Sequence, residues 1–168
     1  MFDAKFISAE VVAALPAGHT LRPLHADDFD KGYMQLLQQL TVIGDVTRDQ
    51  FTERVAFLAA HNDTYYPIVI EDNNAGKVVA AGTLLVERKF IRGCGLVGHI
   101  EDIVVDENQR GKKLGLRIIH ALTFIGSEAG CYKIILNCNK DNVTFYEKCG
   151  YVLKEVEMTQ YIEKNKTC

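Results

Sequence analysis

The chain contains 168 residues, enough for one domain that buries a core without disulfides or metals. Hydrophobic residues make up 48% and charged residues 24%, a balance typical of globular rather than disordered proteins. The net charge is -3 and no basic block stands out, so nucleic acid is not expected as a partner.

Targeting and redox features favour an intracellular protein. The N-terminus lacks the basic start and apolar run of a signal peptide, and no apolar run approaches the ~20 residues that span a bilayer. The 5 cysteines are an odd number without a C-x-x-C pair, and the 5 histidines show no metal-ligand spacing. We therefore expect a cytoplasmic protein without a membrane span, disulfide framework or metal.

The first predicted elements follow a leader, residues 1–18, which is expected to be loosely held. Residues 19–168 should form a single domain. Residues 20–24 predict a short edge strand, which tolerates the missing N–H of a proline. One helix should begin with Asp27 as its N-cap, and a second should begin with Thr47.

The second half alternates strands and helices after a hairpin. A helix with an apolar stripe from Leu114 to Ile125 follows a sharp turn. The order β-α-α-β-β-β-α-β-α-β predicts an α/β (α+β) fold, with a mixed, mostly antiparallel central sheet and helices on both faces. The remaining elements are strands at 65–70, 77–87, 97–105, 131–136 and 151–161, and a short helix at 142–149.

The segment 101–115 joins an apolar strand to a helix through a polar, glycine-containing turn. Backbone N–H groups at such a helix start converge on one point, and the helix dipole adds positive potential, so a pyrophosphate fits there. A basic loop that merely connects strand and helix would have the same sequence. Neither G-x-x-x-x-G-K-[ST] nor G-x-G-x-x-G occurs, which excludes a P-loop and a dinucleotide fingerprint.

This segment resembles the acetyl-CoA motif [QR]-x-x-G-x-[GA] of the Gcn5-related N-acetyltransferase (GNAT) superfamily. Arg110 and Gly115 match its ends, whereas Lys113 replaces the middle glycine. Residues 142–151 resemble the N-x-x-x-Y-x-x-x-G-[FY] segment of the same superfamily. The resemblance implies the GNAT acyl-CoA N-acyltransferase fold and acetyl-CoA as co-substrate.

A narrower resemblance covers roughly residues 20–160. Residues 84–91, 98–103, 130–136 and 142–150 are similar to the glucosamine-6-phosphate N-acetyltransferase subfamily. This implies direct acetylation of D-glucosamine 6-phosphate to N-acetyl-D-glucosamine 6-phosphate, a step toward UDP-N-acetylglucosamine. It also implies a homodimer.

The resemblance assigns three sets of site residues. The resemblance makes Tyr146 the proton donor to the thiolate; among the catalytic residues we further expect Asn137 to orient the amine and Glu101 or a water to accept its proton. The acetyl-CoA set consists of Glu101, Asp102, Ile103, Val104, Val105, Gln109, Arg110, Gly111, Lys112, Lys113, Leu114, Gly115, Asn142, Phe145 and Tyr146. The substrate set, with basic side chains for the phosphate, consists of Thr41, Lys89, Phe90, Ile91, Arg92, Glu101, Asp102, Lys133 and Asn137.

Two positions depart from the subfamily pattern. Asn137 stands where an acidic residue is common, and Tyr161 stands where an arginine is expected. An amide cannot act as a base, but an amino-sugar amine should titrate near ~8, so much of it arrives neutral. Two alternatives stay open: acetylation of another small amine, and a non-catalytic CoA-binding dimeric module.

Overall fold

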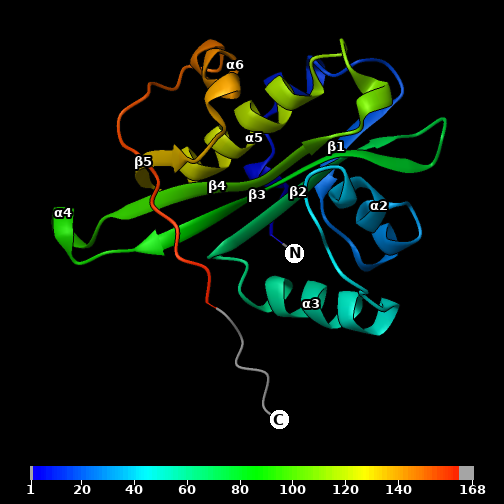
Figure 1. Ribbon diagram of the computed structural model, residues 1–168, viewed down its shortest axis with the longest axis horizontal. Helices are drawn as coiled ribbons and strands as arrows, with labels where there is room; N and C mark the ends of the chain where they lie inside the picture. Colours follow the sequence, from blue (N-terminus) through cyan, green and yellow to red (C-terminus); the bar gives the residue numbers. More distant parts are fainter. Residues whose placement is uncertain (1, 163–168) are drawn as a thin grey trace. The chain divides into compact units, whose positions relative to one another are not determined.

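The computed structural model describes residues 2–162, which belong to two compact units divided after Leu136 (Figure 1). The first unit contains a five-stranded sheet in the order β1-β2-β3-β4-β5. Neighbouring strands are antiparallel except β4 and β5, which are parallel. The strands are β1 (His19–Pro23), β2 (Tyr65–Asp72), β3 (Lys77–Arg88), β4 (Leu96–Val105) and β5 (Cys131–Leu136).

One face of this sheet is covered by α5 (Leu114–Glu128), which contacts β2, β3, β4 and β5 (Figure 1). The apolar stripe predicted for this helix is confirmed, because Leu114, Ile118, Leu122 and Ile125 are all fully buried. Helical spacing brings these side chains onto one face, and burying each of them contributes about 1.5–3 kcal/mol. This layer forms one half of the core.

The opposite face is covered by the 3-10 helix η2 (Ala26–Phe29), α2 (Tyr33–Gln38) and α3 (Arg48–Ala60). The predicted start of α3 is confirmed: the Thr47 hydroxyl accepts from the Gln50 N–H, and the Gln50 side chain accepts from the Thr47 N–H. A second core cluster lies under these helices and includes Leu36, Phe51 and Val55. The sheet is thus buried on both sides.

The predicted Asp27 N-cap is wrong, because the chain forms two short helices here and Asp28 makes the capping contact. Asp28 is fully buried; its Oδ2 accepts from the His25 N–H at 2.7 Å and from Arg22 at 2.9 Å. Gly32 has a φ of +83°, so it separates η2 from α2. Neighbouring aspartates give the same sequence signal, and only the packed arginine selects between them.

The predicted leader packs against the rest of the first unit. Residues 2–14 contain a 3-10 helix, η1 (Ala4–Phe6), and a short helix, α1 (Ala9–Ala13), and both contact α5. The Phe2 side chain is buried, and its ring lies 5.1 Å from that of Tyr66 on β2. Burial of this aromatic contact ties the segment to the sheet, which the local sequence could not reveal.

The remaining elements are short helices. They are α4 (Ile91–Cys94), the 3-10 helices η3 (Glu107–Gln109) and η4 (Lys140–Asn142), and α6 (Val143–Lys148). The strand predicted over 151–161 is wrong, because residues 151–162 form neither helix nor strand. A β-strand needs a hydrogen-bonded neighbour, and none of the described strands pairs with this segment.

Candidate active site

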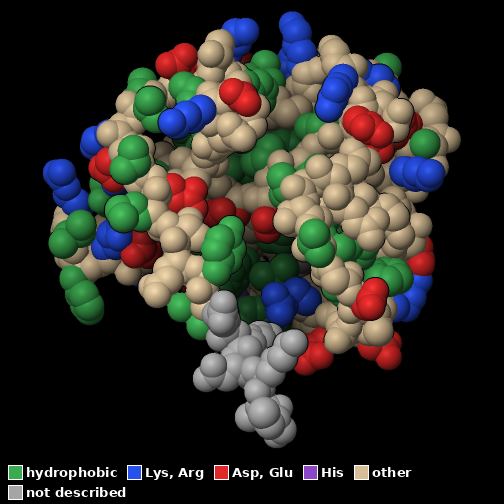
Figure 2. Space-filling view, viewed as in Figure 1, with side chains coloured by type: hydrophobic (Ala, Val, Ile, Leu, Met, Phe, Trp, Pro, Cys, Tyr) green, Lys and Arg blue, Asp and Glu red, His purple; other side chains and the backbone are tan. Residues whose placement is uncertain are grey.

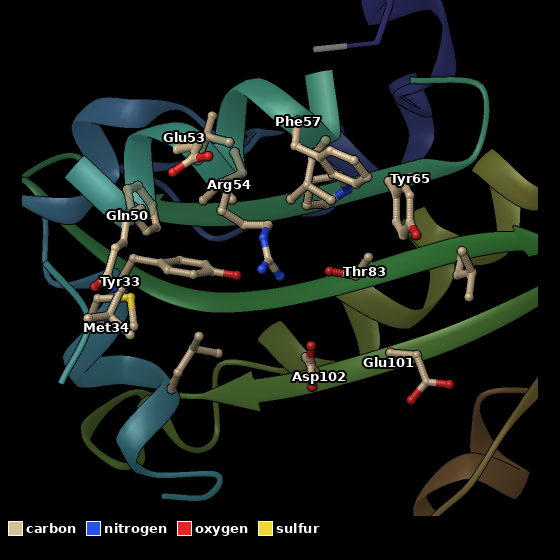
Figure 3. A pocket seen from close by; sticks show the side chains of 18 of the residues that line it. Tyr33, Met34, Gln50, Glu53, Arg54, Phe57, Tyr65, Thr83, Glu101 and Asp102 are labelled. Carbon is tan, nitrogen blue, oxygen red and sulfur yellow. The ribbon is translucent and has the colours of Figure 1, made fainter. Parts of the chain in front are cut away.

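A cavity of about 810 Å³ opens between α2, α3 and the central strands β2, β3 and β4 (Figure 3). Its helix wall carries Tyr33 from α2 and Arg54 from α3. Its sheet wall carries Thr83 from β3 and the adjacent carboxylates Glu101 and Asp102 from β4. The cavity has the size of a small-molecule site and combines apolar walls with a few polar groups.

A β-bulge in β4 lets two adjacent carboxylates face the same cavity. Thr83 pairs with Glu101 and Ala81 with Val104, so two residues of β4 stand opposite the single residue Gly82. Asp102, the first of the two, has a φ of +54°. In a regular strand neighbouring side chains point to opposite faces, and the bulge removes that constraint.

Gly82 makes the bulge possible because it leaves room for the side chain of Ile103. A Cβ at this position would lie 2.4 Å from Ile103 Cδ1 and 2.8 Å from Ile118 Cγ2. A larger residue would push Ile103 away from the sheet. The orientation of the two carboxylates therefore depends on a small residue in the neighbouring strand.

Tyr33 supplies the cavity with a protonated phenol. Burial raises its pKa, and the negative charges of Asp102 and Asp28 raise it further. The hydroxyl group thus remains a hydrogen-bond donor across the physiological pH range. It points into the cavity (Figure 3).

The start of α5 has the geometry of an anion site. Gly111 has a φ of +84°, and Lys113, the N-cap residue, has a φ of +59°. No side chain caps the first turn of α5 within the described residues. Its N–H groups are therefore available to a ligand, and the exposed Arg110 and Lys112 add positive charge.

Lys113, which replaces the middle glycine of the acetyl-CoA motif, is compatible with the shape of this turn. It occupies the left-handed backbone conformation that glycine adopts most readily, so the turn keeps its shape without a glycine. At the start of this turn, Gln109 Nε2 donates to Asp72 Oδ2 at 3.4 Å, and Gln109 Oε1 accepts from Lys112 Nζ.

The strand before this turn has an open edge. The pairing of β4 with β5 ends at Ile100 and Leu136. Val104 and Val105 pair with β3 on one side, and no described strand pairs with residues 102–105 on the other. Their outward backbone groups can hydrogen-bond an extended ligand, as an added strand would.

The other predicted substrate residues do not line the cavity. Thr41 is exposed after α2, and Lys133 is exposed on β5. Phe90 and Ile91 are exposed at the tip of the β3–β4 hairpin. Of the predicted substrate set, Glu101 and Asp102 line this cavity.

The basic side chains at the hairpin tip have partners. Lys89 Nζ lies 2.8 Å from Glu87 Oε1, while Glu87 Oε2 lies 3.0 Å from His99 Nε2. These two partners, Lys89 first, hold the pKa of Glu87 below its usual value. The Arg92 guanidinium lies 5.9 Å from the ring centre of Tyr132.

The remaining predicted residues belong to the second unit. Asn137 and Asn142 are exposed, and the rings of Phe145 and Tyr146 pack edge to face at 5.1 Å on α6. Burial is the main cause that raises the pKa of the Tyr146 hydroxyl, which keeps it protonated. That state is the one a proton donor requires, and the catalytic assignment stays a prediction.

Comparison with known proteins decides the family. The Acetyltransferase (GNAT) family matches residues 21–151. The chain belongs to the GNAT family of acetyltransferases. The GNAT fold predicted from the sequence is thereby confirmed, and the protein is an acetyltransferase enzyme.

Several relatives of this acetyltransferase carry one functional name. It is 56% identical over 145 residues to "Glucosamine 6-phosphate N-acetyltransferase 1" of Dictyostelium discoideum, covering 86% of this chain and 92% of the relative. It is 43% identical to the Arabidopsis thaliana glucosamine 6-phosphate N-acetyltransferase, covering 85% and 96%. The crystal structure of the glucosamine-6-phosphate N-acetyltransferase from Arabidopsis thaliana aligns with a TM-score of 0.85 and 42% identity, covering 86% of this chain and 99% of that one.

Sequence reasoning found only Glu101 and Asp102 among the residues that line the cavity of this acetyltransferase; Tyr33, Arg54 and Thr83 are three of the polar side chains that it missed. Each belongs to a different element, and none carries a motif. Tyr33 has the helical spacing of a core residue relative to Leu36 and Leu37, and a charged residue such as Arg54 is typical of a solvated helix surface. Alternation along β3 was the available signal for Thr83, since it places this side chain on the same face as Leu85.

Two negative findings concern the described part of the chain. None of its helices has the length and hydrophobicity needed to cross a bilayer. Residues 2–162 also contain no cluster of three or more His, Cys, Asp or Glu side chains suited to hold a metal ion.

Proposed function

We propose that this acetyltransferase transfers the acetyl group of acetyl-CoA to the amino group of glucosamine 6-phosphate. The observation that carries the proposal is the 56% identity to a glucosamine 6-phosphate N-acetyltransferase across 86% of the chain. The cavity supports it chemically, because carboxylates suit the ammonium form of an amino sugar and polar side chains suit its hydroxyls. The product, N-acetylglucosamine 6-phosphate, would serve the synthesis of UDP-N-acetylglucosamine.

The proposed acetyl-CoA site uses the backbone more than side chains. The N–H groups at the start of α5 bind the pyrophosphate, and Arg110 and Lys112 add charge. The open edge of β4 at residues 102–105 binds the pantetheine arm through backbone hydrogen bonds. Asn142, the N-cap residue of α6, and Phe145 on α6 contribute further contacts.

The proposed reaction is direct transfer, without an acetyl-enzyme intermediate. The chain positions the neutral amine for attack, so that an N–C bond forms as the C–S bond breaks. Glu101 or a water molecule accepts the proton that leaves the amine. Tyr146 donates its hydroxyl proton to the departing thiolate, and Asn137 orients the amine.

The proposal is tested by the release of free CoA thiol from acetyl-CoA, with glucosamine 6-phosphate and with unphosphorylated glucosamine. We expect rapid release with the phosphorylated sugar and slow release with the other. Absence of release with both sugars, together with measurable acetyl-CoA binding, would select another amine or a non-catalytic CoA-binding module.

Asn137 provides a separate test of direct transfer. We expect Asn137→Asp to change kcat by less than about threefold at pH 8, because a substrate amine with a pKa near ~8 is already half neutral there. A rise of about 100-fold, the size of a general-base contribution, would contradict transfer by positioning alone. The measurement is kcat of the wild type and of Asn137→Asp, each at pH 8 and at pH 6.5.

We further propose that the enzyme is a cytoplasmic homodimer in which residues 151–162 pack against a second copy. The apolar side chains Val152, Val156 and Met158 in this segment are 81–92% exposed in the single chain. An isolated segment with so much apolar surface is suited to an interface. Light scattering at micromolar concentration should give twice the mass of 18.8 kDa, and a monomer would contradict the proposal.

A further inference from the structure

The short helix α2 contributes to one wall of the cavity. Tyr33, Met34 and Leu37 of this helix all line the cavity, and the Tyr33 and Met34 side chains are visible in Figure 3. Leu37 follows Tyr33 by four positions and Met34 by three, spacings that bring side chains to the same side of a helix. A ligand that fills the cavity therefore contacts α2 directly.

The C-terminal end of α2 contacts the turn that leads to α5. Gln39, the C-cap residue of α2, accepts a hydrogen bond through its Oε1 from the Glu107 N–H at 3.0 Å. Glu107 is the first residue of η3, where a backbone N–H has no partner inside the helix. Because η3 leads directly into residues 110–113, this hydrogen bond joins α2 to the turn before α5.

Glycines with positive φ flank α2 on both sides. Gly32, its N-cap residue, has a φ of +83°, and Gly44 has a φ of +67°. A Cβ at Gly44 would meet no atom within 4 Å, and a Cβ at Gly32 would lie 3.8 Å from Gln35 Oε1, so packing confines neither position. Residues 42–46 belong to neither a helix nor a strand. Such segments absorb backbone rotation, so α2 can shift as one piece relative to the sheet.

The two ligands of the proposed reaction therefore act on one movable element. A sugar in the cavity fixes the position of α2, and Gln39 then holds the Glu107 N–H and the turn that follows it. A turn that is already ordered costs less conformational entropy when its N–H groups bind a pyrophosphate. By linkage, the CoA ligand must strengthen the binding of the sugar by the same factor.

We propose that Gln39 is a positioning residue that couples the binding of the sugar to the binding of acetyl-CoA. The inference rests on the proposed function, which places the sugar in the cavity and the pyrophosphate at the start of α5. Gln39 lies outside the cavity lining and acts through the Glu107 N–H. Its role is thus to transmit the state of one site to the other.

The test is calorimetry with CoA, which lacks the acetyl group, so that no transfer occurs when glucosamine 6-phosphate is also present. In the wild type, saturating sugar should lower the Kd of CoA by about 5-fold or more, the lower end of typical coupling between sites. In Gln39→Ala the same ratio should fall to within about twofold of 1, because the acceptor for the Glu107 N–H is lost. Titration of the sugar into CoA-saturated protein should give the same ratios.

Two further variants separate coupling from a general structural role. Gln39→Glu keeps a side-chain oxygen that can accept the hydrogen bond, so it should retain most of the coupling. Gln38→Ala removes the adjacent exposed glutamine of α2 and should leave the ratio unchanged. A residue that only stabilises the fold would weaken both ligands in Gln39→Ala without changing the ratio.

The outcomes distinguish this inference from the proposed function. A ratio near 1 in the wild type, or equal ratios in wild type and Gln39→Ala, would overturn the role of Gln39. If that protein still binds CoA and acetylates glucosamine 6-phosphate, the proposed function stands. A wild type that binds no CoA would overturn both the coupling and the proposed acetyl-CoA site.

Discussion

The start of α5 and the cavity on the opposite face of the sheet reach their chemistry by different routes. The proposed anion site at α5 consists of consecutive residues, 109–115, whose backbone N–H groups are proposed to bind the ligand. The cavity combines side chains from α2, α3, β3 and β4, which are far apart in the chain. A contiguous backbone site leaves a readable motif, whereas a site assembled from separate elements does not.

The two regions nevertheless share one structural device. Lys113 at the start of α5 and Asp102 in the β4 bulge both have φ values between +50° and +60°. Each is a non-glycine residue in the left-handed region, which costs roughly 1–2 kcal/mol. Such strain is common at functional sites, where the surrounding structure supplies the stability that keeps it in place.

Substitution of Asp28 should give the largest loss of stability, since this residue anchors the helices that form one wall of the cavity. It accepts from Arg22 and from the His25 N–H while fully buried. Asp28→Ala leaves Arg22 with one carboxylate partner fewer and should lower the free energy of unfolding by about 3–5 kcal/mol in urea denaturation. The control Asp27→Ala, at an exposed neighbour, should change it by less than about 0.5 kcal/mol. Equal effects would show that the buried network does not hold this wall.

Substitution of Gly82 should give the next largest loss of stability, and it tests the bulge. Gly82→Ala should destabilise the protein by about 1–3 kcal/mol through overpacking against Ile103 and Ile118, and should lower kcat/KM by moving the β4 carboxylates. Adding Ile103→Val removes the Cδ1 atom closest to the new Cβ, so it should recover part of both losses. A double variant no better than Gly82→Ala would argue against this contact as the cause.

Substitutions in the turn before α5 should change the free energy of unfolding less. The change should have opposite signs at the two residues with positive φ, Lys113 and Gly111. Lys113→Gly should raise the free energy of unfolding by up to about 1 kcal/mol because it relieves the strain. Gly111→Ala should lower it by about 1–2 kcal/mol, since a φ of +84° disfavours any side chain. Urea denaturation of both variants measures the pair, and changes of the same sign would contradict the left-handed assignment.

Substitution of Glu71 should give the smallest effect, which should appear in the pH dependence of the free energy of unfolding. Lys31 foremost, and Arg22 as well, hold its pKa below the usual 4.5, although burial opposes them. A carboxylate with a lowered folded-state pKa contributes stability above its unfolded pKa, and this contribution is lost as pH falls through the folded pKa. The stability difference between wild type and Glu71→Gln should therefore shrink between pH 6 and pH 3.5. A constant difference would show that charge at Glu71 is irrelevant.

The sequence could predict whatever depends on consecutive residues. Alternation and helical spacing gave β2, β3, β4 and the stripe of α5, because one buried face imposes a period on the chain. The Thr47 cap was readable because a capping box spans four residues. The turn of residues 109–115 was readable for the same reason, through its glycines and its motif.

Tertiary structure alone decided which separated residues meet. It selected Asp28 over Asp27 through Arg22, buried Phe2 against Tyr66 and left residues 151–162 without a strand partner within the described chain. It also brought Arg54 and the β4 carboxylates to one cavity, through a bulge opposite Gly82. A single sequence records the local preferences of each residue. Contacts between distant segments follow from the packing of the whole sheet, and no local pattern encodes them.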